Sequence, residues 1–314
     1  MVRAKLDETT FIELFETKGP TEVARAGNIN LRNVFARRAS LEKKLGRKIE
    51  APLSFRNREV HIHPKRIELA ISDGVVLIGS DGHYWPEEVS VAHRAFVKFA
   101  KDMAPKAVIM NGDVFDGASI SRFPPIGWTH QPTVQEEIET CQERLDEVIK
   151  AKPKSCRTIH TLGNHDARFE GRIATVAPEF AKVMGTSLSD HFPLWEKCWS
   201  VAINDDVIIK HRFKGGIHAT RNNVLNAGRT MITGHLHSAK VSPISDYNGT
   251  RWGVDTGCLA DPDADAFSYT EDNPKDWRSG FCVLTFKGGQ LLWPELVTKH
   301  DENSVQFRGE VIKV

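Results

Sequence analysis

The chain has 314 residues, of which 40% are hydrophobic and 26% charged, so it is long and apolar enough to fold around a full core. Its net charge of only +1 excludes a strongly basic or acidic protein whose overall charge would define its partner. The five cysteines are odd in number and form no CxxC pair, which argues against a disulfide framework and a thiolate zinc site and favours a reducing compartment.

Two further absences indicate where the protein works. The N-terminal sequence MVRAKLDETT lacks the apolar region of a signal peptide. No apolar run reaches the length that would span a membrane. We therefore expect a cytoplasmic protein without a membrane partner.

Residues 1–50 are predicted to form a small helical segment, followed by a linker over residues 51–73. The first helix should end at Lys18-Gly19-Pro20, where proline suits the first turn of a second helix. Gly27-Asn28 tolerates positive φ and should end that second helix, and Asn30 can cap a third. The apolar stripe expected on the third helix consists of Leu31, Val34, Phe35, Leu41 and Leu45.

From residue 74 the pattern changes to short apolar strands alternating with helices, which predicts an α/β domain over residues 74–314. Helical patterns lie near Val89–Asp102 and Thr133–Lys150, and residues 167–206 are predicted to be an insertion, or cap, between core strands. The expected strands are Val75–Gly79, Ala107–Met110, Thr158–Leu162, Val207–Lys210, Thr230–Thr233, Arg251–Asp255, Gly280–Phe286 and Gln290–Glu295.

Side chains that can bind a metal directly follow the first five of these strands. Sites in open α/β sheets collect at the carboxyl ends of strands, so five strands would deliver these side chains to one rim. Imidazole, carboxylate and amide donors suit manganese, iron, zinc or nickel. Seven donors are too many for one ion but suit two ions bridged by a carboxylate, a recurrent arrangement in phosphoryl chemistry. The seven are Asp81, His83, Asp113, Asn164, His211, His235 and His237.

In chain order the motifs read D-x-H, G-D-x-x-D, G-N-H-D, a lone His and G-H-x-H. This set resembles the calcineurin-like metallophosphoesterase family, over roughly residues 74–300 of the chain. The resemblance implies a four-layer α/β/β/α sandwich with two divalent ions, manganese being the first choice and iron, zinc, nickel or magnesium the alternatives. It also implies hydrolysis of a phosphoester by attack of metal hydroxide.

The resemblance assigns the metal ligands to two sites that share one bridging carboxylate. The first metal would be bound by Asp81, His83 and His237. The second would be bound by Asn164, His211 and His235, with Asp113 as the bridge. The lone-His position has a competitor in His218, but His211 follows a predicted strand directly and is therefore preferred.

Further roles follow from the same resemblance. His165 would be the general acid that protonates the leaving oxygen, and Asp166 would orient it. Asp116 would orient a metal ligand such as His83. Contacts to the substrate phosphate are expected from Arg168, for which a surface salt bridge is an equal alternative, and from Lys214 and His218.

The segment 23–34 is similar to a helix-turn-helix, although Gly27-Asn28 stands where the usual pattern has an apolar residue followed by glycine. Between Arg25 and Lys48 there are eight basic residues and one acid. Such a face can contact several phosphates, the alternatives being a solvated helical face or an oligomerisation arm. The candidate contacts to nucleic acid are Arg32, Arg37, Arg38, Lys43 and Lys44.

Together these features predict a di-metal phosphodiesterase that acts as a nuclease on DNA, with the N-terminal segment holding the polymer. The tandem of a helix-turn-helix and a metallophosphoesterase domain resembles proteins encoded by bacteriophages and prophages. One alternative is a phosphomonoesterase, or a phosphodiesterase for cyclic nucleotides or other small molecules, in which the segment serves assembly. Another is a non-catalytic DNA-binding protein with a metal-stabilised fold, against which the complete ligand set and His165 count.

Overall fold

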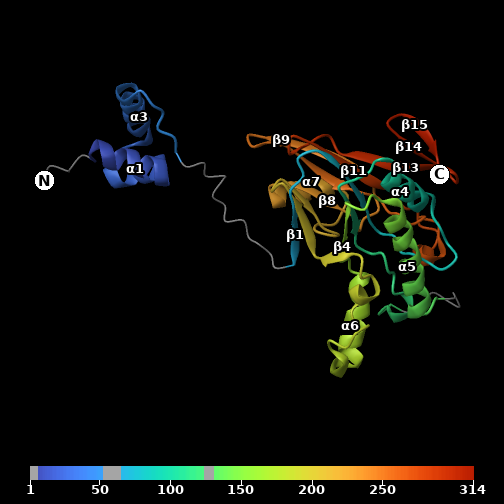
Figure 1. Cartoon of the computed structure of the whole chain (residues 1–314). Helices are drawn as coiled ribbons and strands as arrows, with labels where there is room; N and C mark the ends of the chain where they lie inside the picture. Colours follow the sequence, from blue (N-terminus) through green and yellow to red (C-terminus); the bar gives the residue numbers. More distant parts are fainter. Residues whose placement is uncertain (1–5, 52–64, 124–130) are drawn as a thin grey trace. The chain divides into compact units, whose positions relative to one another are not determined.

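The computed structural model describes residues 6–51, 65–123 and 131–314. The chain divides into two compact units, residues 1–63 and 64–314 (Figure 1). Of the predicted linker over residues 51–73, residues 52–64 lie outside the described residues. The prediction is wrong for Arg66–Leu69, which form the strand β1 of the second unit. Their apolar residues are needed to complete a sheet.

The first unit contains three helices, α1 (Glu8–Lys18), α2 (Pro20–Gly27) and α3 (Leu31–Leu45). Left-handed Asn28 ends α2, and the Asn30 side chain caps α3 by accepting a hydrogen bond of 2.8 Å from the Asn33 N–H. These boundaries are the ones that the sequence predicts. The small core consists of Phe11, Phe15, Val23, Val34, Leu41 and Ile49.

The predicted apolar stripe of α3 is only partly buried. Val34 and Leu41 lie in the core. Leu31, Phe35 and Leu45 are 45%, 43% and 44% exposed, so more than half of the stripe lies outside the core. The reason is geometric, because two short helices cover only one side of α3.

The second unit contains two β-sheets. The nine-stranded sheet has the order β15-β14-β13-β11-β2-β3-β4-β5, with β12 paired to β11. The six-stranded sheet has the order β1-β6-β7-β8-β10-β9. Strands of the larger sheet are β2 (Gly74–Gly79), β3 (Ala107–Asn111), β4 (Arg157–Thr161), β5 (Glu196–Cys198), β11 (Gly280–Lys287), β12 (Gln290–Leu291), β13 (Glu295–Asp301), β14 (Ser304–Phe307) and β15 (Glu310–Lys313). The smaller sheet adds β6 (Ser200–Ile203), β7 (Val207–Ile209), β8 (Thr230–Thr233), β9 (Lys240–Asp246) and β10 (Gly249–Asp255) to β1.

The two sheets pack face to face, with helices on both outer faces. Val76 and Ile78 of β2 point into the apolar layer between the sheets, whereas Leu77 points to the other side. On that outer face lie α4 (Val91–Asp102) and α5 (Val134–Ala151), and α7 (Ala219–Ala227) packs on the outer face of the six-stranded sheet. The order of layers confirms the predicted α/β/β/α sandwich with a small helical segment before it.

The region predicted as an insertion, residues 167–206, is only partly one. Helix α6 (Asp166–Val176) extends away from the sheets in Figure 1. The end of the region, however, supplies β5 to one sheet and β6 to the other, so the prediction is wrong there. Among the described residues, no helix is long and apolar enough to cross a membrane.

Candidate metal centre

The loops that carry the predicted ligands meet where the two sheets come together. Strands β2, β3 and β4 belong to the nine-stranded sheet and β7 and β8 to the other, so the expectation of one sheet rim is wrong. Backbone hydrogen bonds join the loops: the N–H of Asp81 donates to the Gly112 carbonyl over 2.9 Å, and that of Gly234 to His211 over 2.9 Å. The ligands therefore converge from two sheets packed together.

The side chains form overlapping clusters whose potential ligand atoms all lie within 4.8 Å of one another. The first cluster contains Asp81, His83 and His237, and the second contains Asp113, His211 and His235. A third combination, His83, Asp113 and His165, links the two. Six of the seven predicted ligands thus fall into two groups, in the division that the sequence predicts for two ions.

Five of these ligands have a backbone conformation that is rare for residues with a side chain. The φ angle is positive at Asp81 (54°), His83 (37°), Asp113 (54°), His235 (72°) and His237 (56°). Left-handed backbone costs about 1 kcal/mol or more per residue outside glycine and is concentrated at functional sites. The turns after the strands hold these side chains inward at that cost.

Two motif glycines are required because neighbouring ligands pack directly against them. A Cβ atom on Gly163 would lie 2.0 Å from Asp113 Oδ1. A Cβ atom on Gly234 would lie 2.4 Å from Asp81 Oδ2. The glycines of G-N-H-D and G-H-x-H therefore let one ligand loop approach the carboxylate of another.

Hydrogen bonds fix which nitrogen of each histidine is left for a metal. Nδ1 of His211 lies 2.9 Å from the carbonyl oxygen of Asn111, which can only accept, so Nδ1 carries the proton. Nδ1 of His83 likewise faces Asp116 Oδ1 over 2.7 Å. In both rings Nε2 is therefore the nitrogen available to a metal, and for His211 it lies 3.0 Å from Asp113 Oδ2.

Both buried carboxylates keep a low pKa. Burial alone would raise the pKa of Asp81 and Asp113, but the adjacent histidines, His211 above all for Asp113, lower both below the usual value. Burial would lower the pKa of His211, yet Asp113 and Asp81 raise it to about 10. Two ionised carboxylates out of contact with water require positive charge close by.

Orphaned polar atoms add to the case for metal. Within the described residues, the buried atoms Asn164 Oδ1 and His237 Nδ1 have no hydrogen-bond partner. Buried polar atoms are rarely left unpaired, so each orphan calls for a partner. Paired carboxylates, free imidazole nitrogens and an unpaired amide oxygen fit two divalent cations.

His165 belongs to the same site but has different partners. Its Nδ1 lies 3.0 Å from both Oδ1 and the backbone oxygen of Asp116. Burial would lower the pKa of His165, but Asp116 and Asp113 raise it above the usual value. On the other side of the ring, Arg168 Nη2 lies 3.1 Å from Nε2. Asp116 thus holds both His83 and His165.

The predicted role of Asp166 is wrong. Its carboxylate accepts backbone hydrogen bonds from Asp113 (2.8 Å), Gly163 (2.8 Å) and two further residues of the loop after β3, and it contacts His160 Nε2 over 3.1 Å. Asp166 starts α6 immediately after the turn, which places its side chain beneath the loop. It fixes the ligand loops, and Asp116 orients His165.

Three supporting features are absent from the sequence prediction. Asp255 Oδ1 accepts hydrogen bonds from the N–H groups of Ser238 and Ala239, directly after His237. Asp255 is the last residue of a predicted strand, and this position could have identified it as a supporting residue. Glu137 of α5 accepts hydrogen bonds from the N–H groups beside Asp116. Phe267 packs 5.1 Å from the His83 ring. No motif or spacing in the sequence points to Glu137 or Phe267.

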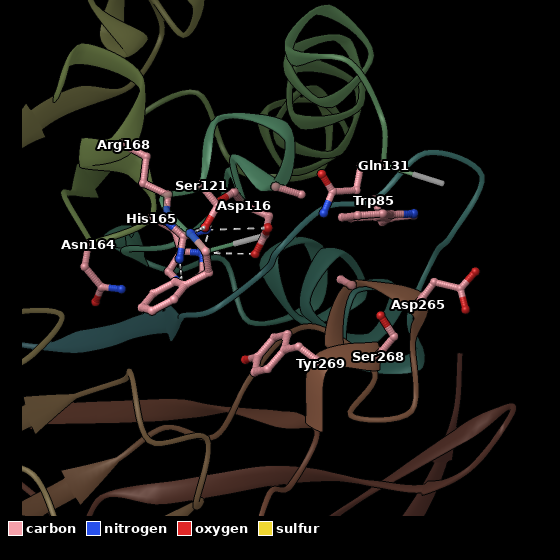
Figure 2. Close-up of a pocket in the computed structure, with 13 residues that line it drawn as sticks. Trp85, Asp116, Ser121, Gln131, Asn164, His165, Arg168, Asp265, Ser268 and Tyr269 are labelled. Carbon is pink, nitrogen blue, oxygen red and sulfur yellow. Dashed lines mark hydrogen bonds and ion pairs between the residues drawn. The ribbon is translucent and has the colours of Figure 1, made fainter. Parts of the chain in front are cut away.

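A pocket of about 630 Å³ opens on the His165 side of the centre. Figure 2 shows Asn164, His165 and Arg168 at one end of it and Trp85 with Gln131 at the other, while Tyr269 lies along a third side. The end with His165 is polar, and Trp85, Phe123 and Tyr269 add aromatic lining. The pocket can therefore take an organic group attached to a phosphate at the His165 end.

The remaining predicted substrate contacts differ in position. Arg168 lines the pocket and bonds the Asp116 carbonyl over 2.9 Å, so it is not a simple surface salt bridge. Lys214 and His218 are exposed and do not line it. His218 immediately precedes α7, whereas His211 is 1% exposed at the centre, which favours His211 as the ligand.

The predicted nucleic-acid contacts of the first unit are partly engaged within that unit. Arg37 donates to the Leu6 carbonyl and lies over the Phe11 ring, and Lys44 pairs with Glu8 over 2.7 Å. Arg38 lies 3.6 Å from Glu42. Arg32 and Lys43 are exposed, without an ion pair to a described residue.

No protein-family model matches the sequence, and no curated protein does so either. Among solved structures, the chain is similar to zinc-bound Vps29 from Entamoeba histolytica (14% identity, TM-score 0.40, covering 76% of this chain and 98% of that one). It is also similar to the phosphoesterase Yfce from E. coli (13%, 0.33, 76% and 96%) and a dimetal phosphatase from Danio rerio (8%, 0.38, 78% and 99%). All three TM-scores lie below 0.5, so what the chain does has to be inferred from its own site.

Proposed function

We propose that the chain is a metal-dependent phosphoester hydrolase and, more specifically, a phosphodiesterase that cleaves DNA. The observation that carries the proposal is the pair of Asp/His clusters joined through Asp113, with His165 beside them at the head of a pocket. Divalent ions bound there would supply Lewis acidity that activates water and neutralises charge on the phosphate. Manganese is the first ion to test, since the mixed imidazole, carboxylate and amide donors suit it.

His165 is placed to handle the proton of the leaving group. Asp116 holds Nδ1, which leaves Nε2 directed to the pocket beside Arg168. Arg168 would turn to the bound phosphate, a stronger partner for a guanidinium than an imidazole nitrogen. Nε2 would then carry the proton that the leaving oxygen needs.

The pocket supports a substrate with a sizeable group on the leaving side. Its volume of about 630 Å³ and its Trp85 and Tyr269 walls suit a nucleoside, whose base can stack on aromatic rings. A nucleic-acid substrate also agrees with the exposed Arg32 and Lys43 of the first unit.

Turnover of four substrates tests the proposal: bis-nitrophenyl phosphate, mono-nitrophenyl phosphate, and linear single- and double-stranded DNA. With Mn²⁺ present, we expect hydrolysis of the diester and of DNA and weak action on the monoester. Good monoester turnover without action on any polynucleotide would reject the nuclease in favour of a phosphomonoesterase. DNA binding without any turnover would indicate a metal-stabilised binding protein.

Two variants connect activity to the site. Asp113→Ala removes the carboxylate that belongs to the second cluster and to the combination that links it with the first, and is expected to abolish hydrolysis and lower the metal content. His165→Ala leaves both three-residue clusters intact and is expected to slow hydrolysis by about 10²–10⁴-fold with metal content largely retained. Equal activity of the His165 variant and the wild type would remove the general acid from the proposal.

A further inference from the structure

Residues 207–245 contain six Lys or Arg and no Asp or Glu. This acid-free segment contains β7, α7, β8 and most of β9, and it carries three of the predicted metal ligands. Outside residues 1–50 the chain as a whole has more acidic than basic residues. The segment that builds one side of the metal centre therefore carries net positive charge within a unit that is otherwise net acidic.

The topology separates the basic residues of the segment into two groups. Because β7 and β8 are parallel neighbours, α7 starts at the edge that holds the metal centre and ends at the opposite edge. Lys210 and Arg212 flank His211, Lys214 follows in the same loop, and Arg221 lies in the first turn of α7. Arg229 follows α7 at the opposite edge.

The group beside the metal centre is not neutralised by the protein. Lys210, Arg212, Lys214 and Arg221 form no ion pair with a carboxylate of the described chain, whereas Lys240 pairs with Asp276 over 2.8 Å. Phe213 is 42% exposed, with Lys210 Nζ 5.2 Å and Lys214 Nζ 5.5 Å from its ring centroid. An exposed ring among unpaired cations is the combination that binds single-stranded nucleic acid.

We propose that Arg212, Lys214 and Arg221 form a phosphate strip that binds a nucleic-acid strand next to the phosphodiester at the metal centre. Phe213 supplies a stacking platform for one base. The pocket beside His165 is not lined by Phe213 or by any of the three residues of the strip. The strand would thus run from the pocket, past the ligands, to the strip. This inference rests on the proposed function for the position of the scissile bond, but the strip itself is a binding surface.

The strip is tested by binding under conditions where cleavage cannot occur. The full chain with Arg212→Ser, Lys214→Ser and Arg221→Ser is titrated with a single-stranded DNA hexamer in EDTA at several salt concentrations. The matched control is Lys101→Ser, Lys150→Ser and Arg229→Ser, which removes equal charge from the last turns of α4 and α5 and from the residue before β8, at the opposite edge. Polyglutamate serves as a polyanion without phosphate or bases.

The strip variant should bind the hexamer about tenfold more weakly at ~0.1 M salt. The slope of log affinity against log salt should fall by about 2, since each phosphate contact to a single strand contributes about 0.7. The control variant should keep wild-type affinity. A strip variant that binds like the wild type overturns the proposal, as does an equal loss in the control.

Two further measurements identify the partner. Phe213→Leu should weaken binding of the hexamer but not of an abasic strand of equal length, and an equal effect on both would reject the stacking platform. Equally tight binding of polyglutamate would replace nucleic acid by an acidic protein as the partner. Wild-type turnover of bis-nitrophenyl phosphate tests the proposed function separately, so either idea can fail without the other.

Discussion

At the scale of single residues, the centre depends on side chains that hold other side chains. Asp116 contacts Nδ1 of His83 and of His165, and one carboxylate thereby sets the orientation of a ligand and of the expected acid. Asp166 carries the same carboxylate at the end of the next motif, yet it accepts hydrogen bonds from backbone N–H groups of the ligand loops. Two neighbouring aspartates thus support the site in different ways.

This difference predicts opposite behaviour of two isosteric variants. Asp116→Asn should lower kcat by about 10–100-fold with little change in thermal stability, because only the orientation of two imidazoles is disturbed. Asp166→Asn should lower the melting temperature, because an amide cannot accept all of the hydrogen bonds from the loops after β3 and β4. The measurements are steady-state kinetics and calorimetry on metal-loaded protein. A stable, inactive Asp166→Asn would return the orienting role to that residue.

At the scale of elements, helix α5 connects the core to the loop after β3 that carries Asp116. The helix begins with a capping box of Thr133 and Glu136. The next residue, Glu137, is buried and accepts hydrogen bonds from the N–H groups of Gly117 (2.6 Å) and Ala118 (3.1 Å). Burial raises the pKa of Glu137 to about 7, so near neutral pH the loop that carries Asp116 rests on a titrating carboxyl group.

The raised pKa predicts a pH dependence of stability. Below about pH 4.5 Glu137 is protonated in both the folded and the unfolded chain, and its contribution is fully present. As the pH rises to about 7, only the unfolded chain ionises, so stability falls by up to about 3 kcal/mol. Urea unfolding of the wild type and of Glu137→Gln from pH 4.5 to 8 should show this fall as a difference between them. Parallel curves would contradict the raised pKa.

At the scale of the whole molecule, the second unit starts earlier than its sequence pattern suggests. Strand β1 pairs in parallel with β6 from Arg66 to Leu69. Leu69 and Ile71 are buried in the layer between the sheets, and the Asn204 side chain bonds both backbone groups of Ile71. An edge strand of the six-stranded sheet is thus supplied by residues that precede the first motif.

Two truncations follow from this boundary. A chain that starts at residue 65 keeps β1 and should fold and hydrolyse bis-nitrophenyl phosphate as the full chain does. A chain that starts at residue 74 loses β1 and two buried apolar side chains, at a cost of about 5 kcal/mol or more, comparable to the stability of a whole domain. It should be insoluble or unfolded by circular dichroism. A soluble, active protein starting at residue 74 would show that β1 is dispensable.

The sequence by itself determined what is local in this protein. A strand followed by a glycine-containing turn predicts where each ligand leaves the backbone, so the set from Asp81 to His237 follows from short motifs. The four-layer fold is what the family resemblance of those motifs implies. Helix boundaries such as Asn28 and Asn30 are equally local, because capping involves residues three or four positions apart.

The tertiary structure alone decided what depends on partners distant in the chain. It placed the ligand strands in two sheets instead of one. It also made Asp116, and not Asp166, the carboxylate that contacts the His165 ring. It also assigned β1 and β6 to one sheet across more than a hundred residues, and brought Glu137 beneath the catalytic loop. The physical reason is that a hydrogen bond or a strand pair is chosen by packing, and spacing along the chain carries no record of which surfaces will meet.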